Sequence, residues 1–256
     1  NGGRYLQGNA DPRILREILN QFNQRGIPCR FTFTNPLITM EQLSDPFCNA
    51  ILKAADNGLN EVIVFSPMLE DYIREHYPDI PITSSTCKQI ENYDELCAEM
   101  DKDYSLVVLD YNFNNDFDVM EKLPHKEKAE LLINPCCDPA CKRRGEHYRS
   151  IGRSQIALTE HMKKRTGTPY DPEPFECRCM QKNLYQTIDS PLHISPDAIY
   201  GKYAPMGFEN FKIEGRSVPD VNVLENYIYY MVKPEFKDEV RLELLLSLTN
   251  KIKYFG

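Results

Sequence analysis

Five cysteines fall in two short stretches of the chain. Cys136, Cys137 and Cys141 follow one predicted strand, and Cys177 and Cys179 form a second close pair later in the chain. Thiolates are preferred ligands of zinc and of iron–sulfur clusters, and a close pair lets two sulfurs reach one centre. The pattern therefore predicts a metal or iron–sulfur centre held by Cys137, Cys141, Cys177 and Cys179.

Other interpretations of these cysteines stay open at this point. Neither spacing, Cys-x3-Cys or Cys-x-Cys, is the Cys-x2-Cys of a zinc ribbon, so structural zinc and plain thiols are alternatives, and Cys136 could replace Cys137 as a ligand. The nine cysteines come without a secretion signal, which argues against a disulfide framework. Cys48 and Cys97 fall on apolar helical stretches, where buried thiols are common.

Charged residues alternate with apolar ones in the last predicted strand. Lys212 and Glu214 point one way if Phe211 and Ile213 point the other, so the charged pair would face the interior of a barrel. Buried charges are costly unless they are paired. The pair is therefore either an ion pair that fills the interior or a general acid and base, with Arg216 at the rim to bind an anion.

A run of basic residues opens a long predicted helix beside the first cysteine loop. Lys142, Arg143 and Arg144 lead into this helix, and His147, Arg149 and Arg153 follow in its first turns. Such runs are usually solvated, but here they adjoin the predicted centre, which favours an anionic substrate. His147 is a further candidate ligand or proton donor.

Polar residues also follow several other predicted strands. Asn35, Asp110 and Asn134 each come directly after one. Turn chemistry explains such residues one at a time, whereas their recurrence at the same ends of parallel strands favours a polar pocket there.

Short β-rich runs alternate with amphipathic helical runs along the chain, which is typical of a parallel sheet covered by helices. Strands are predicted at residues 30–34, 61–65, 80–83, 105–109, 130–133, 192–194 and 211–214. Helices are predicted at residues 11–25, 45–58, 68–77, 93–100, 144–164, 221–232 and 234–253.

This order predicts a single TIM-like (β/α)8 barrel domain over residues 1–256, with a cysteine-bearing insertion at about 134–180. A helix precedes the first of the seven strands, so we expect an eighth strand before residue 1, or a barrel that opens at that edge. A doubly wound open sheet is the alternative. The absence of a glycine-rich loop after any strand weakens it.

The bulk composition narrows the class of protein. The chain has 256 residues, 41% of them hydrophobic, and a net charge of −8. The negative balance argues against generic nucleic-acid binding, and no apolar run is long enough to cross a membrane. Because this sequence shows no signal peptide, we expect a cytoplasmic location; the alternative is a chain from which a leader has been removed. Oligomeric state is not readable from the sequence.

One motif resembles a known family. The segment Phe211-Lys212-Ile213-Glu214-Gly215-Arg216, preceded by Gly207-Phe208, is similar to the signature of the collagenase-like peptidase family, peptidase family U-thirty-two. The cysteine loop after an internal strand is similar in placement. The chain departs from the family at Asn134–Cys136, where a His-Gly segment usually precedes the first cysteine.

The resemblance implies a TIM-like barrel with a 4Fe–4S cluster on Cys137, Cys141, Cys177 and Cys179, and a pocket lined by Lys212, Glu214 and Arg216. It also implies an oxygen-independent hydroxylase or related modifying enzyme that acts on a small or RNA-borne substrate. Two alternatives remain, a non-catalytic binding barrel with structural zinc and a peptidase. No His-Glu-x-x-His helix supports the latter.

Overall fold

The chain folds into a curled, six-stranded parallel sheet with helices packed around it. The computed structural model describes residues 12–164, 167–172, 175–177, 179, 182–215 and 219–253. Its strands hydrogen-bond in chain order. They are β1 (Arg30–Phe33), β2 (Glu61–Val64), β3 (Ile82–Ser84), β4 (Leu106–Val108), β5 (Ala129–Leu132) and β6 (Asn210–Lys212).

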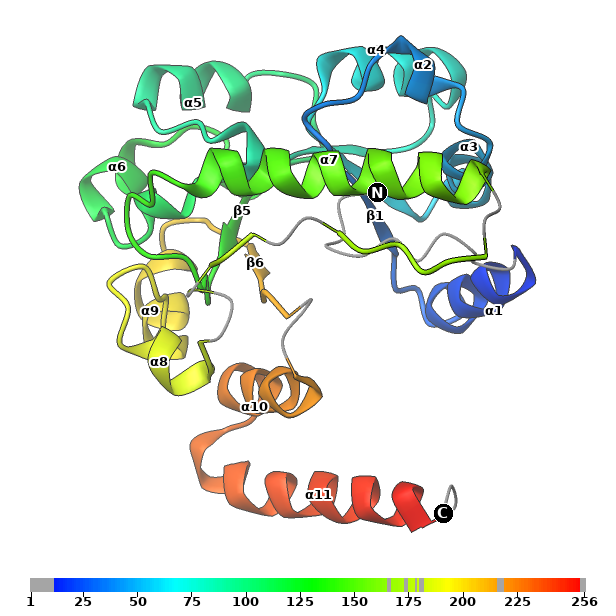
Figure 1. The fold of residues 1–256 in the computed structure, drawn as a ribbon. Helices are drawn as coiled ribbons and strands as arrows, with labels where there is room; N and C mark the ends of the chain where they lie inside the picture. The colour runs from blue at the N-terminus through cyan, green and yellow to red at the C-terminus, as the bar shows by residue number, and fades with distance from the viewer. Residues whose placement is uncertain are drawn as a thin grey trace.

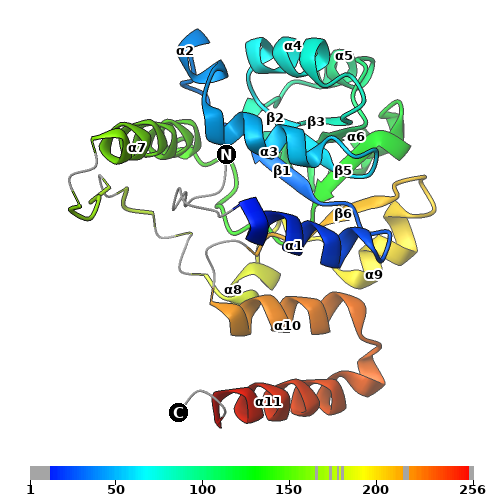
Figure 2. The same ribbon diagram turned by 90° about the vertical axis from the view of Figure 1, so that its right-hand side faces the viewer.

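Helices follow or precede each strand, and Figures 1 and 2 show how they surround the sheet. Proline at the first turn and polar N-caps start several of them: the Asp45 carboxylate accepts a hydrogen bond from Cys48 N at the start of α3. The helices are α1 (Pro12–Asn23), α2 (Met40–Leu43), α3 (Pro46–Ala55), α4 (Pro67–His76), α5 (Tyr93–Met100), α6 (Phe117–Lys122), α7 (Arg144–Lys163), α8 (Leu184–Ile188), α9 (Pro196–Ala198), α10 (Asp220–Met231) and α11 (Lys237–Lys253).

The main hydrophobic core lies between the outer face of the sheet and helices α3 to α6. Alternate strand residues such as Val62, Val107 and Leu131 point outward into it. They meet buried helix residues such as Leu52 and Ile73. Because the side chains of a strand alternate, the residues between them must face the concave side of the sheet.

An ion pair across the concave side demonstrates how strongly the sheet curls. Arg30 Nη1 on β1 lies 2.6 Å from Glu130 Oε1 on β5, although three strands separate β1 from β5 in the sheet. The same guanidinium contacts Glu61 on the neighbouring strand at 2.8 Å. A flat sheet could not bring β1 and β5 together, since adjacent strands lie roughly 4.8 Å apart. The sheet is thus a half-barrel.

The described residues form an open α/β barrel, consistent with the prediction of a barrel that opens at one edge, and not a complete (β/α)8 barrel. Among the described residues six strands pair, and β1 and β6 form the open edges of the sheet. The predicted strand at 192–194 is not a strand: Ile194 N donates one hydrogen bond to Ile133 O, and β5 pairs directly with β6. The turn at Ser190–His193 leaves this segment too short to form a ladder. The predicted strand before residue 1 lies outside the described residues.

The long connection between β5 and β6 carries the cysteine loops and α7. Figure 1 shows α7 as one long helix that crosses the front of the molecule. Beyond β6, α10 and α11 lie one under the other, as Figure 2 shows, and Arg241 of α11 forms two hydrogen bonds with Glu225 of α10. None of the helices in the described part of the chain combines the length and the apolar character that a membrane span requires.

Candidate functional site

A cavity of about 170 Å³ lies at the carboxyl ends of the strands, under α7. Tyr148, Gly152 and Gln155 of α7 form one wall. Side chains from the strands and the loops that follow them form the others. The polar ones among these include Asn35, Cys87, Tyr111, Cys137, Lys212 and Glu214, together with the hydroxyls of Thr32, Thr34, Ser85 and Thr86. The carboxyl ends of parallel strands are the usual place for an active site in α/β barrels.

Lys212 points into the half-barrel and is paired below the cavity. Its Nζ lies 3.0 Å from Glu130 Oε2, the carboxylate that also holds Arg30. Burial opposes ionisation of Glu130, but Lys212 and Arg30 outweigh that effect and lower its pKa. The lysine is thus part of an ion network that forms the floor of the cavity, with Glu130 as partner.

Glu214 is held in position by two buried amides. Asn134 Oδ1 accepts a hydrogen bond from Glu214 N at 2.6 Å, and Asn134 Nδ2 donates to Glu214 O at 2.9 Å. Asn226 of α10 accepts a further hydrogen bond from Asn134 Nδ2 at 2.7 Å. Both asparagines are buried. The backbone at Glu214 is therefore fixed to the end of β5 and to α10.

The Glu214 carboxylate connects the cavity to the first cysteine loop. Its Oε2 accepts hydrogen bonds from Cys136 N at 3.1 Å and from Cys136 Sγ at 3.0 Å. Cys136 is thereby occupied with the glutamate, whereas Cys137 lines the cavity. This arrangement favours Cys137 over Cys136 as a ligand.

The two cysteine stretches meet beside the cavity. Burial raises the pKa of the Cys137 thiol; Tyr111 opposes this effect, whereas the nearby Glu214, Cys141 and Cys177 add to it. The second stretch is tied to the first loop, because Cys179 Sγ donates to Asp138 Oδ2 at 3.5 Å and Lys182 Nζ lies 2.5 Å from Asp138 Oδ1. Burial raises the pKa of Cys179 to about 11. Thiols from both loops are thus neighbours in the fold.

The sulfurs are near one another but do not form a ready-made ligand set. In the described ranges there is no group of three or more histidine, cysteine, aspartate or glutamate side chains arranged to hold a metal ion. The donor types suit a soft metal or an iron–sulfur cluster. Binding would require the two loops to close further and the thiols to lose protons.

A buried ion pair anchors α7 above the cavity. Arg144, in the first turn of α7, is 4% exposed and forms hydrogen bonds with both carboxylate oxygens of Asp110, which follows β4. Its guanidinium also lies 4.5 Å from the ring centroid of Tyr111 and 3.2 Å from Glu91 Oε1. The arginine thus fixes both α7 and the Tyr111 ring.

The other sequence-predicted residues have different surroundings. His147 lines the cavity, and its ring stacks on Phe175 with centroids 4.5 Å apart. Arg143 lies over the same phenylalanine ring. Arg153 pairs with Glu146 at the surface. Arg216 lies outside the described residues.

Sequence reasoning missed several residues of the cavity, among them two tyrosines. Tyr111 and Tyr148 both line the cavity, and burial raises the pKa of each hydroxyl. Tyr111 directly follows Asp110, so the strand-end pattern pointed to its position. Tyr148 lies next to His147 on a helix, and no pattern in the sequence distinguished it from a core residue.

Comparison with known proteins gives no relative: no family model, no curated protein and no solved structure matches the chain.

Proposed function

We propose that this chain is an enzyme in which Cys137, Cys141, Cys177 and Cys179 hold an iron–sulfur cluster beside a substrate cavity at the open end of the half-barrel. The observation that carries the proposal is the meeting of the two cysteine loops at this cavity, which also contains Lys212 and Glu214. The resemblance of residues 211–216 to the collagenase-like peptidase family supports it independently.

In this proposal the side chains around the cavity have different roles. The cluster would supply electron transfer next to the cavity. Lys212, held by Glu130, and the tyrosines would bind and orient the substrate. Glu214 is the candidate proton acceptor, since its carboxylate lies in the cavity on a backbone fixed by Asn134. We propose a modification reaction such as oxygen-independent hydroxylation, on a small molecule or a base carried by RNA, in which water would supply the oxygen atom and an external acceptor would take up the two electrons by way of the cluster.

Metal and sulfide analysis of anaerobically purified protein tests this proposal. We expect a brown protein that contains iron and acid-labile sulfide. Cys177→Ala should lose most of the iron, because one of four ligands is gone. Cys48→Ala is the matched control: this thiol lies in α3 among core residues, and we expect full iron content. Cys136→Ala should also keep its iron.

Two outcomes would contradict the proposal. One is a colourless protein with one zinc ion per chain, whose removal by a chelator unfolds it; that result would indicate a structural zinc instead. The other is an iron content that does not differ between the Cys177→Ala and Cys48→Ala variants.

A further inference from the structure

A buried tyrosine hydroxyl lines the cavity without a hydrogen-bond partner among the described residues. Tyr111 is 3% exposed and lines the cavity, yet in the described part of the chain its Oη forms no hydrogen bond of normal geometry; its polar neighbours there are the Cys137 thiol and the Arg144 guanidinium. Its ring is held by the Arg144 guanidinium. A tyrosine hydroxyl is a good donor at neutral pH, and leaving it unmet inside a protein is costly. A ligand oxygen could accept from it.

The charges around the cavity already balance one another. Lys212 is paired with Glu130, which also binds Arg30, and Arg144 is paired with Asp110. Both cations are therefore already engaged by carboxylates, and an anionic ligand would have to compete with these carboxylates for its counter-charge. The cavity thus favours an uncharged ligand.

The size and walls of the cavity indicate a single ring. Ile63, Val108, Leu132 and Ile151 provide apolar surface around the polar groups. The volume is about 170 Å³. An apolar cavity of about 150 Å³ in another protein holds benzene.

We propose that this cavity binds a neutral, carbonyl-bearing molecule the size of one ring, whose oxygen accepts a hydrogen bond from Tyr111 Oη. The inference rests on the proposed function in one respect: it assigns this ligand to the cavity that the proposed substrate would occupy. It replaces the expectation of an anionic substrate with that of an uncharged one.

Benzamide and benzoate form a matched pair of probes. They have nearly the same shape, but benzamide is neutral with a carbonyl oxygen and benzoate is an anion. Calorimetric titration of the full-length protein should show that benzamide binds at least tenfold more tightly than benzoate. Equal or tighter binding of benzoate would overturn the proposal, and so would a failure of both probes to bind.

A tyrosine variant tests the hydrogen bond itself. Tyr111→Phe keeps the ring over Arg144 and removes only the hydroxyl, so benzamide should bind about three- to tenfold more weakly, the effect of one net hydrogen bond. Tyr185→Phe, at an exposed position on α8, is the control and should bind as the unaltered protein does. Unchanged benzamide affinity in Tyr111→Phe would contradict the assignment. If that variant does not fold, the comparison of the two probes on the unaltered protein decides.

Failure of this inference and failure of the proposed function are distinguishable. A protein that carries iron and sulfide but prefers benzoate would refute the neutral ligand and leave the cluster standing. A protein without iron that binds benzamide through Tyr111 would do the reverse.

Discussion

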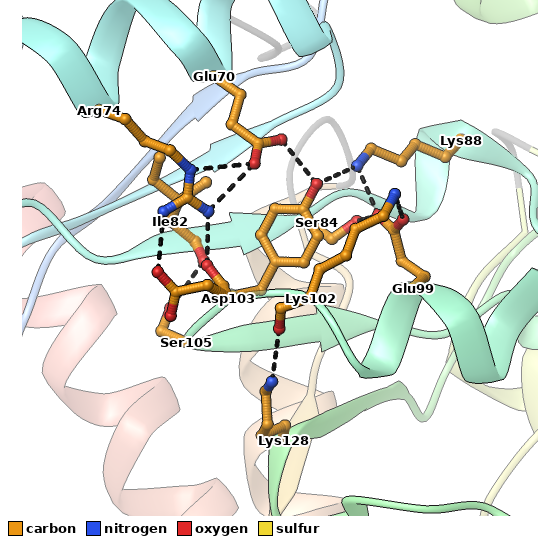
Figure 3. Close-up of polar contacts among 11 residues, drawn as sticks. Glu70, Arg74, Ile82, Ser84, Lys88, Glu99, Lys102, Asp103, Ser105 and Lys128 are labelled. Atoms are coloured by element: carbon orange, nitrogen blue, oxygen red, sulfur yellow. Dashed lines mark hydrogen bonds and ion pairs between the residues drawn. The ribbon is translucent and has the colours of Figure 1, made fainter.

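The half-barrel carries two polar clusters that differ in how completely their groups are paired. Figure 3 shows the first, on the outer side of β3 and β4. There Glu99 accepts hydrogen bonds from Ser84, Lys88 and Lys102, and Tyr104 donates to Glu70 at 2.6 Å. The second cluster, around Tyr111 and Cys137 in the cavity, has a buried hydroxyl with no hydrogen-bond partner in the described ranges and brings thiols of two loops together.

This difference distinguishes polar groups that stabilise the fold from polar groups that can bind a ligand. A cluster whose members satisfy one another fixes the fold, because each group has exchanged water for a protein partner. In a cluster with an unpaired donor, that donor has lost its hydrogen bond to water and has gained none from the protein. A ligand can provide the missing acceptor. We therefore expect changes in the Glu99 cluster to affect stability and changes in the Tyr111 cluster to affect binding.

The largest effect is expected from Glu99→Ala. The substitution leaves the Lys88 ammonium without its carboxylate, and removal of one partner from a buried ion pair costs about 3–5 kcal/mol. Urea unfolding should show this loss of stability. The iron content of the folded fraction should stay the same, and loss of iron from a variant that remains folded would contradict the separation.

The pH dependence of the unfolding free energy should also show the contribution of Glu99. Burial opposes ionisation of Glu99, but Lys102, Lys88 and Ser84 outweigh it and lower its pKa to about 2. Because the folded pKa is depressed, this contribution is complete above the unfolded value of about 4.3 and is lost as the pH falls toward 2. Glu99→Gln should thus give a flatter profile of unfolding free energy over this range. An unchanged profile would contradict the assignment.

A glycine of α7 provides a test of intermediate size. A Cβ at Gly152 would lie 2.5 Å from Asn35 Oδ1, which is already held by Leu37 N. Gly152→Ala should push α7 away from β1, cost about 1–3 kcal/mol and weaken benzamide binding in the cavity. Gly201→Ala, which meets nothing within 4 Å, should change neither quantity by a comparable amount. Thermal unfolding and titration measure both.

The smallest effect is expected at the surface of the same helix. Arg153 and Glu146 form an exposed ion pair with N–O distance 2.7 Å. Exposed pairs contribute about 0–1 kcal/mol, so Arg153→Ala should change stability by less than 1 kcal/mol and leave probe binding unchanged. A large loss of binding would show that the basic run of α7 acts on the ligand after all.

The sequence predicted the positions of the strands better than it predicted whether the sheet closes into a barrel. Continuous apolar runs such as residues 61–65 marked buried strands, because period and burial are local properties. Residues 192–194 have a similar composition, but the adjacent turn and the direct pairing of β5 with β6 exclude them from the ladder. Whether a sheet closes depends on pairing between distant strands, which no local pattern records.

The candidate site was predictable only where it depends on local patterns in the sequence. Cysteine spacing and strand alternation identified the loops and the inward direction of Lys212 and Glu214. The partner of Lys212 comes from β5, and the amides that fix Glu214 come from β5 and α10. These contacts join residues that are distant in sequence, so local sequence patterns do not reveal them.

X-ray absorption at the iron edge of the anaerobically purified protein tests the central claim most directly. We expect iron surrounded by sulfur, with a second shell of neighbouring iron atoms, as in a cluster held by thiolates. Iron bound mainly by oxygen or nitrogen, or a sample that contains zinc in place of iron, would contradict the assignment of Cys137, Cys141, Cys177 and Cys179 to an iron–sulfur cluster.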